Sequence, residues 1–303
     1  MKIHAEAKPL HEPLAGGTPA ATVVVEPLVA GRVSWSKDMM ESPGGRFLTL
    51  RLARGLFSSA DRVQVPCPAF LIRHPSVGNV LVDTGLHPSI ASDPRANFGR
   101  LAVRVAPPDL EQGEDVAAQL RKRDIEPSQV AVVVMTHLHF DHASAISEFP
   151  DSTFVVSEVE WVEATTARQP AMQGYRPVHY DFVFDYRTVD FGRANISSYA
   201  SFGRTFDLFG DGSVRLAYTP GHTAGHMCVI CRLRERDFVI GGDAVYTEAQ
   251  LEGNAPPPPR PADQHNWRRS LQELKLFRSQ FPDAVITPGH DADFYAQLDE
   301  RYE

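Results

Sequence analysis

Four metal-ligand side chains follow directly after a short apolar run, and this arrangement constrains the fold more than any other feature of the sequence. The run Ala-Val-Val-Val-Met at residues 131–135 is typical of a buried strand. His137, His139, Asp141 and His142 come next. Two histidines separated by one residue point the same way from an extended chain, so His137 and His139 can bind one ion.

Asp141 and His142 fall where the chain is expected to turn into a helix, over residues 143–149. Their side chains therefore leave at a different angle and suit a neighbouring second ion. The segment predicts a two-metal site at the end of a strand. The alternative is a run of surface histidines that happens to follow a strand.

Three later segments repeat one design, in which an apolar strand is followed by small residues or Pro-Gly and then by a ligand-type side chain. The three side chains are His222, Asp243 and His290. Glycine beside each of them lets the backbone approach a site closely. A lone His or Asp after a strand is more often a capping or surface residue, but together with the first cluster these three predict further metal donors.

The order of the expected elements indicates two sheets packed together with helices outside, which is an α/β fold. Residues 1–20, rich in Pro, Gly and Ala, are expected to form a flexible arm, and residues 21–303 a single domain. Residues 168–206 have weak periodicity and are expected to form a long excursion near the site. Pro256–Pro259 predicts an extended polyproline loop. Strands are expected at 22–29, 47–52, 67–73, 80–83, 130–135, 153–156, 214–219, 227–233 and 238–240, and the clearest helices at 114–123 and 263–281.

Composition excludes some classes of function. The net charge of −8 over 303 residues argues against a nucleic-acid binder, which needs a basic surface to neutralise phosphates. The first residues have no apolar core of signal-peptide length, and no segment approaches the roughly 18 apolar residues that span a bilayer, so we expect a cytoplasmic protein without a membrane partner. Cys228 and Cys231 are expected to pack on opposite faces of a strand rather than to form a redox or metal pair.

The motif His137-x-His139-x-Asp141-His142, followed in order by the three later donors, resembles the metallo-β-lactamase superfamily. Residues 81–85, Leu-Val-Asp-Thr-Gly, resemble its early strand-and-turn motif, and the resemblance runs from about residue 67 to residue 290. It implies an αββα sandwich of two mixed β-sheets flanked by helices, with the site at one edge of the sheets. It also implies one ion bound by His137, His139 and His222, another bound by Asp141, His142 and His290, and Asp243 as the bridge between them.

The same resemblance assigns supporting roles. Asp83 would orient a metal ligand, although a simple turn-forming aspartate is the alternative. His226 opens the strand after the His222 turn and is expected to support the site by hydrogen bonding. Two divalent ions are implied, zinc first, with iron, cobalt or manganese as alternatives because mixed His and carboxylate sites accept several metals. Ordinary surface or core positions are expected for His4, His11, His74, His87, His179 and His265.

Tyr246 narrows the resemblance to one group of enzymes. It lies three residues after Asp243, and with the two histidine motifs it makes the chain similar to the N-acyl homoserine lactonases. In that family the matching tyrosine hydrogen-bonds the substrate. The implied reaction is attack of a metal-bridging hydroxide on the lactone carbonyl, with Tyr246 holding the oxyanion and Asp141 passing a proton to the departing ring oxygen. Tyr246 packed in the core is the alternative.

The acyl lactone would be a small-molecule substrate, and a homodimer is an open alternative for the assembly. An acyl-chain wall, or else ordinary core packing, is expected from Trp35, Met39, Met40 and Phe47. Other reactions at the same metals stay open: a glyoxalase II-like thioesterase, another ester or lactone hydrolase, and a phosphodiesterase. A non-catalytic metal-binding module is the alternative outside enzymes.

Overall fold

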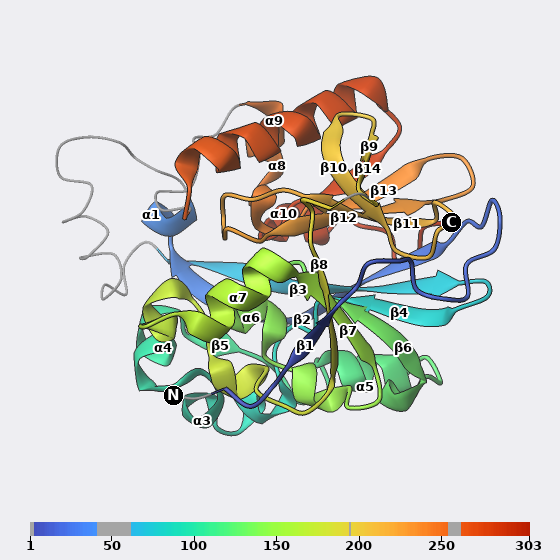
Figure 1. The fold of residues 1–303 in the computed structure, drawn as a ribbon. Helices are drawn as coiled ribbons and strands as arrows, with labels where there is room; N and C mark the ends of the chain where they lie inside the picture. Colours follow the sequence, from blue (N-terminus) through green and yellow to red (C-terminus); the bar gives the residue numbers. More distant parts are fainter. Residues whose placement is uncertain (1–2, 41–61, 194, 254–261) are drawn as a thin grey trace.

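Two β-sheets pack face to face in the computed structural model (Figure 1), which describes residues 3–40, 62–193, 195–253 and 262–303. The first sheet contains eight strands, which lie in the order β1 (Ala7–Pro9), β8 (Asp185–Val189), β7 (Thr153–Ser157), β6 (Val130–Val134), β4 (Gly78–Val82), β3 (Arg62–His74), β2 (Val24–Ser36) and β5 (Pro108–Asp109). The second contains six, in the order β14 (Val285–Thr287), β13 (Asp237–Ile240), β12 (Met227–Arg232), β11 (Val214–Tyr218), β10 (Phe202–Asp207) and β9 (Ser197–Tyr199).

Both sheets are mixed. In the first sheet, neighbouring strands are parallel from β1 through β8, β7 and β6 to β4. They are antiparallel from β4 through β3 and β2 to β5. In the second sheet only the β13–β14 pair among the described strands is parallel. Parallel neighbours end at the same edge of a sheet, so the segments that follow β4, β6, β13 and β14 can reach one place.

The main core fills the space between the sheets. Phe70 and Val134 project from the first sheet, and Val229 and Phe238 from the second. The Phe70 and Phe238 rings meet at a centroid distance of 6.0 Å in an edge-to-face arrangement. Side chains alternate across each strand, so the opposite face of each sheet needs its own cover.

Helices provide that cover. Helices α5 (Val116–Arg121) and α7 (Glu158–Thr166) pack on the outer face of the first sheet, and α8 (Glu248–Glu252) and α9 (Gln264–Gln280) on the outer face of the second (Figure 1). The expected αββα sandwich is therefore confirmed. The expected helix at 263–281 is also confirmed, since Oδ1 of Asp263 caps α9 by accepting from two backbone N–H groups.

Short helical turns complete the described chain. The α-helical ones are α1 (Lys37–Met40), α3 (Pro94–Phe98), α4 (Arg100–Val105), α6 (Phe140–Ala143) and α10 (Ala292–Tyr295). The 3₁₀ turns are η1 (Pro88–Ala91), η2 (Pro127–Gln129), η3 (Ile146–Glu148), η4 (Pro170–Gln173), η5 (Pro177–His179) and η6 (Gly242–Ala244). No helix among the described residues is long and apolar enough to cross a membrane.

Several local expectations were wrong. In the segment expected as a flexible arm, Ala7–Pro9 forms β1 beside β8, and Leu10 is buried in the main core. Strands β8 and β9 were not predicted within the 168–206 excursion; β8 pairs with β7 and β1, and this pairing outweighs the weak local pattern. The helix expected at 143–149 is replaced by α6 and η3. The strand expected at 47–52 and the polyproline at Pro256–Pro259 lie outside the described residues.

The cysteine expectation is confirmed. Cys228 and Cys231 are both buried free thiols on β12. Cys228 belongs to the cluster under α9, and Cys231 to the core between the sheets. The two thiols therefore face opposite sides of one strand and cannot act as a pair.

Replacing Phe238 with alanine tests the core between the sheets. The ring is fully buried against Phe70 and Tyr302, so Phe238→Ala should lower the free energy of unfolding by roughly 3–5 kcal/mol. Denaturant unfolding measures the change. Phe281→Ala is the matched control, because that ring is 40% exposed and its loss should be clearly smaller. Equal losses in the two variants would contradict the assigned core.

Candidate metal centre

Seven ligand-type side chains from four chain segments meet at one edge of the sandwich. His137 and His139 follow β6, and Asp141 and His142 lie on α6. The other three come from the β11–β12 turn, from η6 and from the residues after β14: His222, Asp243 and His290. All are buried or nearly so. In the three later segments a glycine directly precedes the donor: Gly221, Gly242 and Gly289.

The donor atoms form three groups, each with ligand atoms within 4.8 Å of one another. The groups are His137, His139 and His222; Asp141, His142 and His290; and His137, His142 and Asp243. The third group joins the other two. A pair of neighbouring divalent ions fits this arrangement, with a carboxylate between them.

Unpartnered atoms inside the cluster support a cation. His137 Nε2, His142 Nε2, Asp141 Oδ2 and Asp243 Oδ1 are buried and make no hydrogen bond. Leaving a buried polar atom unsatisfied costs about 1–3 kcal/mol. Four such atoms directed at one another are therefore unfavourable unless a ligand satisfies them. Imidazole nitrogen and carboxylate oxygen are donors for zinc-class ions, so the residues fit such a ligand.

Partners outside the cluster fix how the imidazoles point. His142 Nδ1 lies 2.8 Å from Asp83 Oδ2, and His290 Nδ1 lies 3.0 Å from the Pro66 carbonyl oxygen. Each acceptor can receive a hydrogen bond from Nδ1–H, which leaves Nε2 turned toward the other donors of the cluster. Such outer partners orient metal-binding histidines and raise their basicity.

Asp83 combines both roles that the sequence left open. It orients His142, as expected, and it also makes the turn after β4 with a φ of +57°, in the left-handed region. Its carboxylate accepts from the backbone N–H of Thr136 at 2.8 Å and from the Thr136 hydroxyl at 2.7 Å. Asp83 therefore ties the turn after β4 to the strand end that carries His137.

Asp243 lies at the middle of the cluster. Its Oδ1 is 3.1 Å from His290 Nε2 and 3.3 Å from His142 Nε2, and its Oδ2 is 3.2 Å from His222 Nε2. Burial alone would raise the pKa of Asp243, but these three imidazoles outweigh it and hold the pKa well below its usual range. The carboxylate is therefore ionised and faces donors of both groups.

His226 supports the cluster without pointing at it. Its Nε2 accepts from the backbone N–H of Asp243 at 3.0 Å, and its Nδ1 lies 3.0 Å from the Thr219 hydroxyl. Burial lowers the pKa of His226 to about 4, so the ring is neutral. The expected supporting role is confirmed.

Two residues near the centre carry no signal in the sequence. The Tyr175 ring packs 5.0 Å from the His139 ring, and the Tyr175 hydroxyl donates to the buried carboxylate of Glu160 at 3.1 Å. Burial raises the pKa of Glu160 to about 7, although its hydrogen bonds oppose this. Neither residue has a ligand-like spacing from the donors. The 168–206 excursion reaches the site through Tyr175, whereas His179 bonds to the Asn97 carbonyl instead.

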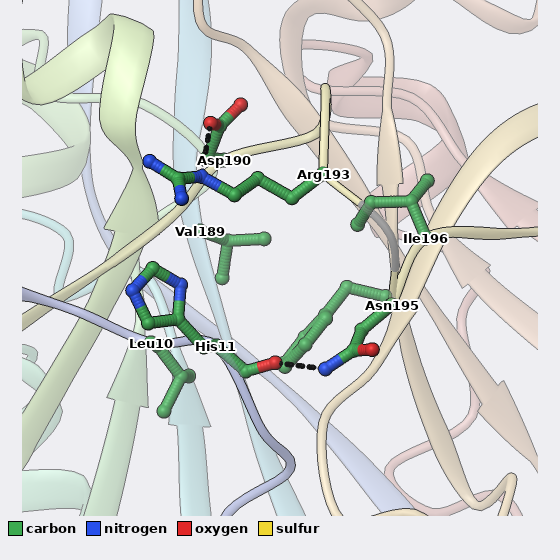
Figure 2. A pocket seen from close by; sticks show the side chains of 8 residues that line it. Leu10, His11, Val189, Asp190, Arg193, Asn195 and Ile196 are labelled. Atoms are coloured by element: carbon green, nitrogen blue, oxygen red, sulfur yellow. Dashed lines mark hydrogen bonds and ion pairs between the residues drawn. The ribbon is translucent and has the colours of Figure 1, made fainter.

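A separate cavity of about 180 Å³ contains none of the seven donors (Figure 2). An Asp190–Arg193 ion pair lies on one side of it, and Asn195 donates to the His11 carbonyl oxygen on another. The apolar remainder of its lining comes from Leu10, Val189, Ile196 and Phe206. Its described lining brings no group of three ligand-type side chains together, so we assign the reactive centre to the donor cluster.

Comparison with known proteins identifies the family. Residues 62–290 match the family model described as the metallo-beta-lactamase superfamily. The chain belongs to this superfamily. It is 32% identical to the N-acyl homoserine lactonase AttM of Rhizobium radiobacter, over 79% of this chain and 87% of the relative. It is also 32% identical to AttM of Azorhizobium caulinodans, over 76% of this chain and 83% of the relative.

Solved structures share the fold of this superfamily member. A mutant of B. thuringiensis AiiA, crystallised with N-decanoyl-L-homoserine at its active site, has a TM-score of 0.73 at 20% identity and covers 92% of this chain and 97% of its own. AidC, a dizinc quorum-quenching lactonase, has a TM-score of 0.55 at 14% identity over 92% of this chain and 91% of its own. The clustered donors of this chain support divalent metal binding.

Metal removal should destabilise the folded protein, because ions bound only by the native cluster shift the folding equilibrium. At a free metal concentration of 100 times the dissociation constant, one site contributes about 2.7 kcal/mol. Denaturant unfolding with and without chelator measures this difference, and added metal should restore it. His265→Ala changes an exposed histidine outside the cluster and should respond like the unmodified chain. An equal free energy of unfolding with and without chelator would contradict a metal centre.

Proposed function

We propose that this chain is a metal-dependent hydrolase that opens the lactone ring of N-acyl homoserine lactones. The observation that carries the proposal is Tyr246 beside the complete donor cluster: its hydroxyl oxygen lies 3.0 Å from His222 Nδ1. The lactonase names of the relatives that align over most of the chain support the same substrate class.

Each donor group would hold one ion, zinc first among the divalent metals. His137, His139 and His222 would bind one ion and Asp141, His142 and His290 the other, with Asp243 between them. Two ions held there supply Lewis-acid activation of water and of a carbonyl oxygen. The chain's own residues then have to orient the lactone, stabilise the charge that develops on its carbonyl oxygen, and move a proton to the departing ring oxygen.

Tyr246 fits the role of charge stabiliser. With His222 Nε2 bound to the proposed ion, its Nδ1 would carry the ring proton and donate to the Tyr246 oxygen. The phenol hydrogen is then free to donate to the substrate. Burial, followed by the charges of Asp243 and Asp141, raises the pKa of Tyr246 well above its ordinary value, so the phenol keeps that hydrogen at neutral pH.

Asp141 fits the role of proton carrier. Its Oδ2 is buried without a hydrogen bond and lies 3.7 Å from His290 Nε2. A carboxylate at the edge of the cluster can take a proton from the attacking water and give it to the ring oxygen as the C–O bond breaks. The carboxylate ends the cycle in the state in which it began.

The acyl chain would lie against an apolar cluster beside the donors. The Trp35 ring is 4.5 Å from the His290 ring and 5.9 Å from the Tyr246 ring. Met40 is buried in the same cluster. Met39 is half-buried next to it, and Phe47 lies outside the described residues. The buried apolar side chains of this cluster include Val33, Val65, Leu86, Ile90, Phe98 and Leu110.

A substrate panel tests the proposal. Ring opening of acyl homoserine lactones, followed by acid release at neutral pH, should exceed hydrolysis of thioesters and phosphodiesters of similar size. A chelator should abolish it, and added divalent metal should restore it. A fully metallated protein that opens no acyl lactone of any chain length would refute the substrate. Preferred thioester cleavage would favour the glyoxalase II-like alternative.

Tyr246→Phe tests the phenol separately. The substitution removes one donor to the developing oxyanion and keeps the ring, so kcat should fall about 10²-fold while metal content stays the same. Steady-state kinetics and elemental analysis measure the two quantities. Tyr199→Phe is a suitable control, because that hydroxyl donates to Asp237 Oδ2 on β13, outside the segments that carry the donors. An unchanged kcat in Tyr246→Phe would remove the phenol from the mechanism.

A further inference from the structure

Glu160 joins three segments that are far apart in the sequence. It lies in the first turn of α7, and its side chain is completely buried. Its Oε1 accepts from the Leu138 backbone N–H at 2.9 Å and from the Tyr175 hydroxyl at 3.1 Å. Its Oε2 accepts from the Thr223 hydroxyl at 2.6 Å. A buried carboxylate is tolerated only with such partners, so these hydrogen bonds hold the four groups together.

All three partners lie beside the same donor group, the three histidines His137, His139 and His222. Leu138 stands between His137 and His139, Thr223 directly follows His222, and Tyr175 packs against the His139 ring. None of the described hydrogen bonds of Glu160 goes to Asp141, His142 or His290, or to a residue next to one of them. Asp83, a buried carboxylate outside the seven donors, bonds directly to the donor His142 and also to Thr136, the residue before His137.

The backbone of the His222 turn also rests on the same helical turn. A Cβ atom on Gly225 would lie 2.1 Å from the Glu160 nitrogen, so only glycine permits this contact. The Ala224 N–H is 3.3 Å from Glu163 Oε2 one helical turn later. Because the backbone of Gly225 contacts the backbone of Glu160, a shift of Glu160 would also move the turn that carries His222.

We propose that Glu160 is a positioning residue that keeps His137, His139 and His222 at metal-binding spacing and so sets the metal affinity of that group alone. This inference rests on the proposed dinuclear centre. Glu160 then supports the three-histidine group, whereas Asp83 bonds directly to His142 and reaches His137 only through Thr136. The chain can therefore lose one ion selectively.

Cobalt titration of the metal-free full-length protein tests the proposal. Visible absorption follows each equivalent, and anomalous diffraction at the metal edge assigns the position that loses occupancy. In Glu160→Ala, one of two equivalents should bind about 10–100-fold more weakly, and the loss should lie at the three-histidine group. Glu160→Gln should restore most of the affinity, because its amide oxygen accepts from Leu138 and its NH₂ donates to Thr223.

Two further variants separate this role from a general loss of structure. Thr223→Val removes one hydrogen bond to Glu160 and should weaken the same equivalent by a smaller factor, which keeps the test valid even where Glu160→Ala does not fold. Glu158→Gln removes a charge from the same helical turn and should bind both equivalents like the unmodified chain. Unfolding of the metal-free variants reports on the fold independently of metal.

The outcomes are distinguishable. Two equivalents bound with unchanged affinity in both Glu160→Ala and Thr223→Val would overturn the positioning role, and so would an equal loss at both groups. Fewer than two equivalents in the unmodified chain would overturn the dinuclear centre itself, and this inference with it.

Discussion

The contact between the Asp243 carboxylate and the imidazoles of His142, His222 and His290 is the interaction on which the arrangement of the site depends. It brings together charges and lone pairs that would otherwise be unfavourable in a buried position. The sandwich allows it because parallel neighbours in both sheets end at the same edge. A backbone N–H bond to His226 then fixes Asp243 from behind. The fold thus brings the donor residues together, and the outer hydrogen-bond partners orient their side chains.

The donors could be predicted from the sequence because each one lies in a recognisable local pattern. A buried strand, a tight turn of small residues and a ligand-type side chain occur within a few positions, as at Asp243 and His290. The layers followed from the same strand and helix patterns. Glu160 and Tyr175 could not be predicted, because their importance comes only from contacts with segments distant in the chain. The strands β1 and β8 were missed for the same reason: local composition does not report pairing with remote neighbours.

The long β2–β3 pair connects the shape of the substrate region to the geometry of the metal donors. Strand β2 carries Trp35, whose ring packs on His290, while β3 carries Pro66, whose carbonyl oxygen holds His290 Nδ1. A change at Trp35 in the apolar wall would therefore alter the packing of the donor His290. The apolar wall and the donor His290 thus share one support, the β2–β3 pair.

The position of β1 also has a consequence for how the chain is made. Ala7–Pro9 pairs with Asp185–Val189, and Val25 bridges to Tyr302 near the other end of the chain. During synthesis, the first strand has to wait until more than half of the chain has left the ribosome before its partner exists. Contacts of such long sequence separation slow folding and leave strand edges exposed meanwhile. The first sheet is therefore completed late, with its earliest residues among the last to be placed.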